Sequence, residues 1–166
     1  MESLVEKLNS YNILNNLLPG VVLGFLFESC LSVTIIQGNV IEDLFIYYFI
    51  GMIISRFGSV IVEPLYKKIR LVQFAEYDDY INASKKDKKI EILSETNNTY
   101  RSILSACIVT ILAKIYFAIS TKVNVLSNYK EVLILLMCCV IFSIAYRKQT
   151  RYIFQRIKKN NKEEIK

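Results

Sequence analysis

Four long apolar runs, separated by polar segments, constrain this chain more than any other feature of its sequence. They cover residues 17–36, 44–62, 103–120 and 132–146; the first three hold one charged residue each and the fourth holds none. Twenty helical residues span about 30 Å, the thickness of a hydrocarbon core, whereas a helix of a soluble bundle should carry a polar face. We therefore predict an all-α integral membrane protein: a four-helix transmembrane bundle in residues 1–146, with a helical cytoplasmic loop, and a basic cytoplasmic tail in 147–166.

The absence of histidine narrows the chemistry that this chain can carry. Histidine is the side chain most used for acid–base catalysis near neutral pH, for activating Ser and Cys nucleophiles and for binding zinc, and the 166 residues contain none. The four cysteines all lie in the apolar runs, and no Cys-x-x-Cys pair occurs. We therefore expect neither an enzyme nor a protein that holds a metal ion or another cofactor.

The basic residues predict the orientation of the chain. Eight of them lie between the second and third runs and eight in the tail, whereas the other two loops hold only Lys122 and Lys130. Because Lys and Arg near span ends remain on the cytoplasmic side, we expect the central loop and both termini to be cytoplasmic. The sequence thus predicts a multi-pass protein of the inner (plasma) membrane, with residues 37–43 and 121–131 facing outward.

One charge interrupts each of the first three runs: Glu28, Arg56 and Lys114. Glu28 and Lys114 each continue a stripe in which small residues recur at every fourth position. Small residues let membrane helices approach closely, so we expect these stripes to form helix contacts and to turn the charges toward the protein interior. The predicted packing residues are Gly20, Gly24, Gly51, Ser55, Ser59, Ala106 and Thr110.

Two interpretations of the three intramembrane charges remain open. Glu28 and Lys114 each lie eleven residues beyond the start of their runs, at a depth of about 16 Å, so they are able to pair, and the long Arg56 side chain can reach Glu28 too. An unpaired charge at mid-bilayer costs roughly 2.5–3.5 kcal/mol. The charges either line a path for ions, with anions the more natural cargo because their sum is +1, or form a structural ion cluster that holds the bundle together.

The cytoplasmic loop, residues 65–101, lacks Gly and Pro and is predicted to be helical. Helical spacing from Ile90 into the third run predicts one continuous rod, with a break near Ser84. The second run ends at Glu63 and Pro64, where we expect its helix to break. Acidic residues interleaved with lysines in this loop are typical of a solvated surface, and we expect that surface to serve a cytoplasmic protein partner.

The tail places Ile153, Phe154 and Ile157 among basic residues, which predicts an amphipathic helix on the anionic inner leaflet. Nucleic acid is the less favoured partner, because the tail directly follows a predicted span. Near the N-terminus, Leu4 and Leu8 are spaced for a short interfacial helix. The predicted lipid-binding residues of the tail are Arg147, Lys148, Arg151, Arg156, Lys158 and Lys159.

Three segments carry a resemblance to known proteins: NNLLPG at the start of the first run, SRFGSVIVEPL at the end of the second, and YDDYINASKKDKKIEILSETNNTYRS before the third. With these segments, and in size, span count and layout, the chain resembles small four-span bacterial membrane proteins of antiphage systems, namely the membrane subunit of Kiwa and the multi-span accessory proteins of type VI-B CRISPR loci. The resemblance carries over no individual functional residues. It implies a non-enzymatic homo-oligomer that senses infection or perturbs the inner membrane beside a cytoplasmic partner.

The combined hypothesis is an oligomeric membrane sensor or effector of bacterial antiphage defence. In it, the face that carries the three intramembrane charges meets a central interface. The alternative is a channel or transporter subunit for a small ion or solute. A membrane-embedded enzyme is disfavoured, because the sequence lacks the clustered histidines or carboxylates that such an enzyme needs near the membrane interface.

Overall fold

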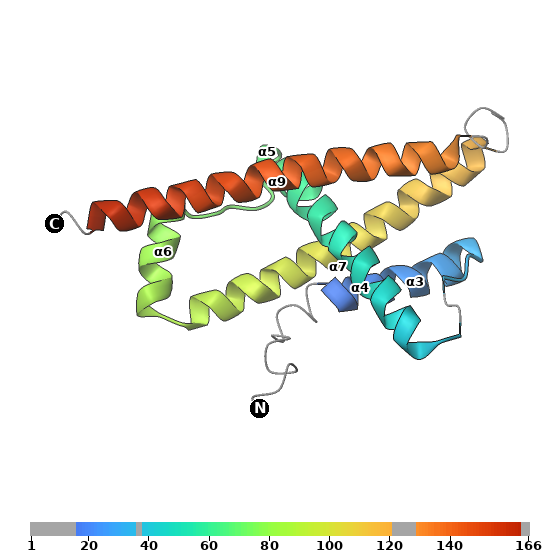
Figure 1. Cartoon of the computed structure of the whole chain (residues 1–166), viewed down its shortest axis with the longest axis horizontal. Coiled ribbons are helices and arrows are strands. Elements are labelled where there is room, and N and C mark those ends of the chain that lie inside the picture. Colours follow the sequence, from blue (N-terminus) through green and yellow to red (C-terminus); the bar gives the residue numbers. More distant parts are fainter. Residues whose placement is uncertain (1–15, 36–37, 121–128, 164–166) are drawn as a thin grey trace.

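The structure, a computed structural model, describes residues 16–35, 38–120 and 129–163. Within these residues the fold is all-α, as the sequence predicts, and consists of five helices. One helix, Val40–Lys68, is built from α4 (Val40–Phe57), the π-helical segment η2 (Gly58–Val62) and α5 (Glu63–Lys68). The other four are α3 (Leu18–Leu31), α6 (Tyr77–Lys86), α7 (Lys89–Ser120) and α9 (Lys130–Glu163) (Figure 1).

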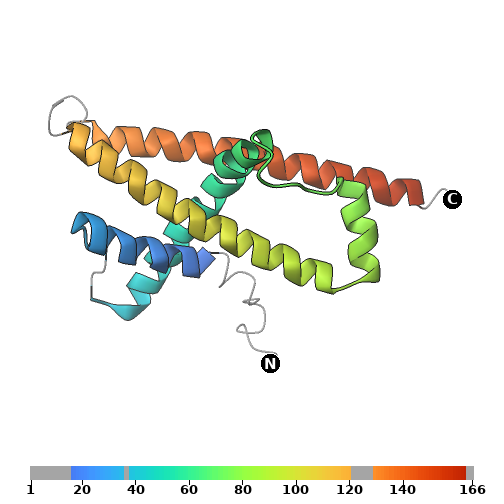
Figure 2. The same ribbon diagram turned by 180° about the vertical axis from the view of Figure 1, so that it is seen from behind.

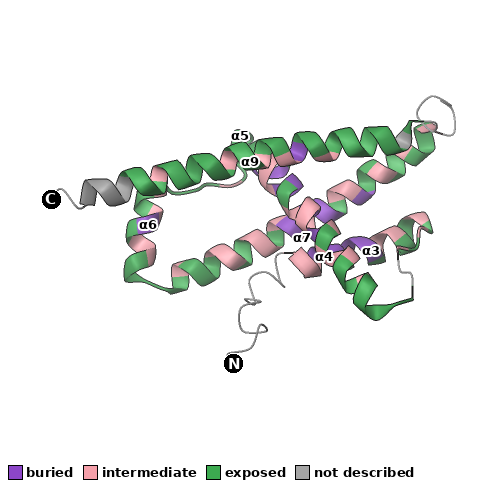
Figure 3. Ribbon diagram, viewed as in Figure 1, coloured by how far each residue is buried: buried purple, intermediate pink, exposed green. Residues whose placement is uncertain are grey.

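The packed centre of the molecule lies where α3, α4 and α7 cross, and α9 runs beside them along the longest axis (Figure 1 and Figure 2). Buried residues gather at this crossing, whereas most of α9 and the C-terminal part of α7 are exposed (Figure 3). The buried apolar side chains form two small clusters, one of Leu23, Ile54 and Ala106 and the other of Phe57, Val62 and Ile141. Ile141 thus anchors α9 to the second cluster.

Two helices are long and apolar enough to cross a membrane, Val40–Lys68 and Lys89–Ser120. Only 28% and 22% of their most apolar windows are buried, which leaves large aliphatic and aromatic side chains such as Phe45, Phe49 and Ile111 exposed. A soluble monomer seldom exposes so much contiguous apolar surface. The surface of these helices therefore suits a lipid environment.

The first predicted span differs from the structure. We expected residues 17–36 to form it, but α3 has 14 residues, about 21 Å in length. It ends because Ser32 takes a left-handed conformation, with φ at 54°. The Ser32 and Val33 N–H groups then donate to the Glu28 and Phe27 carbonyls, a helix-ending pattern usually built on glycine. The apolar residues of the run give no sign in the sequence that the helix ends here.

The fourth predicted span, residues 132–146, lies inside α9, which extends well beyond it at its C-terminal end. These fifteen residues cover about 23 Å and lie between the charged pairs Lys130–Glu131 and Arg147–Lys148. Neither this segment nor α3 is by itself as long as a hydrocarbon core is thick. Four crossings therefore stay a prediction.

The expected break at Glu63–Pro64 is wrong, because the helix continues to Lys68. The reason is the π-helical turn: the Glu63 N–H donates to the carbonyl of Gly58, five residues back. Proline has no N–H to donate, and a single wide turn is a common way for a helix to absorb such a defect. The helix therefore passes through Pro64 with a local change of register.

The predictions for the polar segments agree with the structure in part. We expected residues 65–101 to be helical with a break near Ser84, but residues 69–76 form no helix, and Arg70 takes a left-handed conformation with φ at 58°. Helix α7 is one rod of 32 residues that joins the polar loop to the third run. It is separated from α6 at Asp87 and Lys88, close to the predicted break, and the Asp87 carboxylate accepts a hydrogen bond from the Lys89 N–H at 2.9 Å. The tail is helical as predicted, as far as Glu163. The predicted helix at Leu4 and Leu8 lies outside the described residues.

Helices α3 and α4 cross at two glycines. A Cβ atom at Gly20 would overlap the Tyr47 carbonyl, and one at Gly51 would overlap the Asn16 carbonyl. Both obstacles are backbone atoms, which cannot rotate away. The crossing is therefore possible only because neither residue has a side chain, as the close packing of small residues in membrane helices requires.

We expect Gly51→Ala to lower the free energy of unfolding by about 1–3 kcal/mol, the usual cost of overpacking, measured by thermal unfolding in detergent. Ser29→Thr is the matched control, because it adds one methyl group at an exposed position of α3 and should change stability by less than about 0.5 kcal/mol. Equal melting temperatures for the two variants would contradict the crossing.

Candidate functional site

The three charges that interrupt the apolar runs lie on three different helices: Glu28 on α3, Arg56 on α4 and Lys114 on α7. All three are exposed on the surface of the single chain, and no ion pair between described residues joins any two of them. Within one chain the structure therefore does not bring them together. Whether they line a path for ions or form a structural ion cluster that holds the bundle together stays a prediction.

The predicted packing residues lie mostly at the helix crossings. Gly20 and Gly24 of α3 and Gly51 of α4 are buried, as are Ala106 and Thr110 of α7. Ser55 and Ser59 are half-buried. The small-residue stripes of α3 and α7 thus lie within the packed centre, up to the turn before Glu28 and Lys114.

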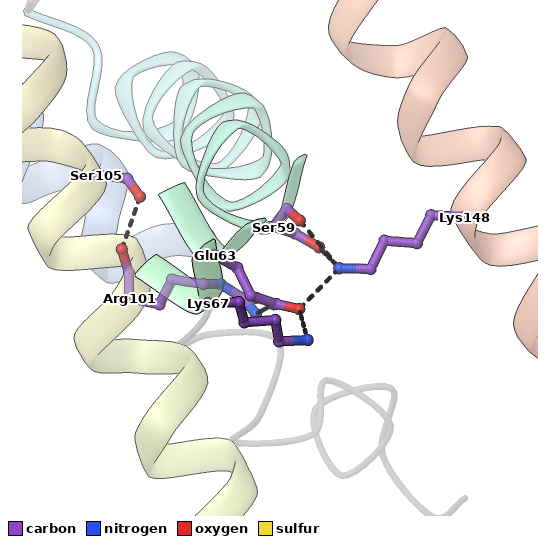
Figure 4. A network of polar contacts seen from close by, with 6 residues as sticks. All are labelled: Ser59, Glu63, Lys67, Arg101, Ser105 and Lys148. Carbon is purple, nitrogen blue, oxygen red and sulfur yellow. Dashed lines mark hydrogen bonds and ion pairs between the residues drawn. The ribbon is translucent and has the colours of Figure 1, made fainter. Parts of the chain in front are cut away.

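The main polar cluster of the described residues surrounds the carboxylate of Glu63, whose side chain is only 7% exposed. Its oxygen Oε2 pairs with Arg101 Nη1 at 2.6 Å, and Oε1 pairs with Lys67 Nζ at 3.0 Å and Lys148 Nζ at 3.2 Å (Figure 4). We call Glu63, Lys67, Arg101 and Lys148 the Glu63 cluster. It ties α5, α7 and α9 together.

The π-helical turn prepares the contact with α9. In this turn each carbonyl accepts a hydrogen bond from the N–H five residues later, so the Ser59 carbonyl would accept one from residue 64. Pro64, however, has no N–H. The Lys148 ammonium supplies the missing donor, at 2.9 Å from the Ser59 carbonyl and 2.9 Å from the Ser59 hydroxyl (Figure 4). The carbonyl that Pro64 leaves without a backbone donor in one helix therefore binds a side chain of another helix.

Arg101 reaches Glu63 because α7 and η2 approach closely. Gly58 faces Ser105, whose hydroxyl would lie 2.5 Å from a Cβ atom at Gly58. The same hydroxyl donates to the Arg101 carbonyl at 2.7 Å. Of the buried polar side-chain atoms that the structure describes, Arg101 Nε and Ser102 Oγ have no hydrogen-bond partner. The Arg101 guanidinium group therefore donates to Glu63 through Nη1, while its Nε has no partner among the described residues.

The cluster is rich in positive charge. One carboxylate faces three cations, which gives it a net formal charge of +2. Burial lowers the pKa of the Lys148 ammonium from its usual value, although the nearby Glu63 carboxylate opposes the shift. Removing one partner of a buried ion pair costs more than the pair itself contributes, so the position of α9 depends on Lys148.

Sequence reasoning missed this cluster. We interpreted Glu63 only as a helix end, Arg101 as an orientation signal and Lys148 as a lipid-binding residue. A signal was nevertheless present, because each of the three lies within two residues of the predicted cytoplasmic end of an apolar run. Opposite charges at equal predicted depth are candidates for pairing.

The arrangement is suited to holding helices together. Among the described residues there is no group of three His, Cys, Asp or Glu side chains placed to hold a metal ion. No protein-family model matches the chain, and the comparisons with curated proteins and with solved structures found no match. Fold and site together define an all-α protein with two helices able to cross a membrane and a buried ion cluster between three of its helices.

Replacing Lys148 with methionine should lower the free energy of unfolding by about 1–3 kcal/mol, because it leaves the Ser59 carbonyl without its side-chain donor and removes one of the two cations that bind Glu63 Oε1. Thermal unfolding in detergent measures the change. Arg147→Met is the matched control, since its exposed side chain should contribute less than about 0.5 kcal/mol. If both variants unfold like the wild type, α9 does not depend on the cluster.

Proposed function

We propose that this chain is a non-enzymatic integral protein of the bacterial inner membrane, and that it acts as an oligomeric sensor or membrane-perturbing effector of antiphage defence. The two long apolar helices and their exposed surfaces support the membrane part of this proposal. The resemblance in size and layout to small four-span defence proteins supports the biological part. The main observation in favour of the proposed arrangement in the membrane is that the Glu63 cluster lies at the ends of three apolar runs.

The cluster aligns the ends of three apolar runs. Glu63 directly follows the second run, Arg101 lies two residues before the third, and Lys148 lies two residues after the fourth. Their ion pairs hold these three positions within a few ångströms of one another. A single membrane boundary at the cluster would therefore leave all three runs on one side and the charged segments on the other.

The ends of the helices support the same arrangement. Helices α3 and α7 end, and α4 and α9 begin, toward one end of the long axis, while α6 and the C-terminal end of α9 lie toward the other (Figure 1). This is the pattern expected when both termini and the central loop are cytoplasmic. We propose four crossings, with the short α3 and the apolar part of α9 accommodated by local bilayer thinning and by flanking charges that reach the headgroups.

In this arrangement the polar ends of α7 and α9 project into the cytoplasm. Helix α6 contacts both, and its Tyr77 ring stacks on Tyr152 of α9 at 5.8 Å between centroids. Because α9 is continuous, Arg147 and Arg151 lie at the headgroups, whereas Lys158 lies about 16 Å beyond Arg147. We therefore assign anionic lipid to the first turn of the tail and the cytoplasmic protein partner to α6 and the distal tail.

Cysteine labelling tests the topology. In a full-length chain whose native cysteines are replaced by serine, we expect a membrane-impermeant maleimide to label Tyr129→Cys in intact spheroplasts. Lys88→Cys should react only after permeabilisation, because the proposal puts it in the cytoplasm. Both positions are exposed in the structure, so accessibility within the protein is matched. Equal labelling of both positions in intact spheroplasts, or release of the chain from membranes by alkaline carbonate, would exclude the proposed topology.

Phage challenge tests the defence role. Cells that express the chain together with its neighbouring genes should lose membrane potential during infection, followed with a potential-sensitive dye, and should form fewer plaques than cells with an empty vector. Unchanged plaque counts and potential over a varied phage panel would contradict the proposal. Potential loss without phage that disappears in Glu28→Gln would instead favour the channel or transporter subunit.

A further inference from the structure

We infer that copies of this chain associate through an ion pair in which Glu28 of one copy binds Lys114 of the next. The inference rests on the proposed membrane location, because that location makes an unpaired charge costly. It deepens the proposed function by naming the partner of the intramembrane charges: a second copy of the same chain.

The need for a partner follows from exposure. Glu28 and Lys114 lie within apolar runs but are exposed on the single chain, and no ion pair between described residues involves either of them. Arg56 is a different case. It precedes the boundary residue Glu63 by seven positions, about 10 Å, so its long side chain can extend toward the headgroups. Glu28 and Lys114 remain as the pair of opposite charges at similar depth.

The packing of α3 against α7 explains why the pair does not close within one chain. The buried small residues end at Gly24 on α3 and at Thr110 on α7. Each charge follows one helical turn later, beyond the contact and on exposed surface. Both charges therefore lie at the edge of the packed centre, where a neighbouring helix can reach them.

The surroundings of the two charges suit a neighbouring protein. Phe25 on α3 is 68% exposed, and Ile111 and Ile115 on α7 are 60% and 50% exposed. A second copy would cover these side chains while it neutralises both charges. Because the α3 surface of one copy meets the α7 surface of the next, the contact is heterologous, and it closes into a ring if the rotation between copies allows.

Charge reversal tests this pairing between copies. The variants Glu28→Lys and Lys114→Glu, each in the full-length chain with a different affinity tag, should lose oligomers when expressed alone, by about tenfold on a native gel of detergent extracts. In each variant like charges meet at the interface. When the two are co-expressed, each contact between unlike copies again joins opposite charges, so we expect oligomers in which the two variants alternate, and these oligomers should carry both tags. Arg56→Glu is the control, and its oligomers should persist.

Several outcomes would overturn the inference. If oligomers return in the double variant Glu28→Lys/Lys114→Glu, but co-expression of the single variants yields no species that carries both tags, the pair forms within one chain. A monomeric wild type, or single variants that remain oligomeric, would mean that no such interface exists. Carbonate extraction of the same membranes tests the membrane location separately, so its failure is distinguishable from failure of the pairing.

A second experiment applies if the reversed charges prevent insertion. In the chain without native cysteines, Glu28→Cys and Lys114→Cys are neutral substitutions at the same positions. Copies of the two variants with different tags should be joined by a short bis-maleimide reagent, because the Cα atoms of a Glu–Lys pair can lie farther apart than a disulfide bridges. Tyr129→Cys paired with Lys114→Cys should not be joined. Absence of the mixed product from membranes that contain both variants would also overturn the inference.

Discussion

The ion pairs of the buried Glu63 carboxylate are the interactions on which the position of α9 against the other helices depends. Helices α3, α4 and α7 are held by glycine crossings and by two small apolar clusters, but α9 buries a single side chain, Ile141, among its described residues. Its remaining specific contact with the centre is Lys148, which binds Glu63 and Ser59. In lipid, exposed apolar side chains supply little force between helices, so a few polar contacts decide where α9 lies.

The proline in the Val40–Lys68 helix links local structure to this contact. Pro64 removes one backbone donor, the π-helical turn shifts the register, and the Ser59 carbonyl is left free to accept from α9. In water a free carbonyl at this place would be hydrated. At the proposed membrane boundary such a carbonyl needs a protein donor or a headgroup, and Lys148 supplies the donor while it also pairs with Glu63.

Much of the fold could be predicted from the sequence, because long apolar runs and the absence of Gly and Pro are local signals. They predicted the all-α class, the continuous α7 rod and the helical tail. The early end of α3 could not be predicted, because Ser32 takes the left-handed position that glycine usually holds. Continuation through Pro64 depends on a π-helical turn, and the Glu63 cluster depends on side chains 38 and 85 residues apart in the sequence. Such contacts are set by tertiary packing.

The charges near the apolar runs divide by whether the chain itself provides their partners. At the predicted boundary, Glu63 pairs with three cations within 3.2 Å. One lies on the next turn of its own helix, and the others lie on α7 and α9. In the proposed topology Glu28 and Lys114 lie about one bilayer leaflet deeper, on exposed surface and without an ion pair among the described residues. A charge is tolerated in lipid only when something neutralises it. The boundary cluster therefore sets the fold of one chain, and the deeper pair is the feature best placed to determine how chains assemble.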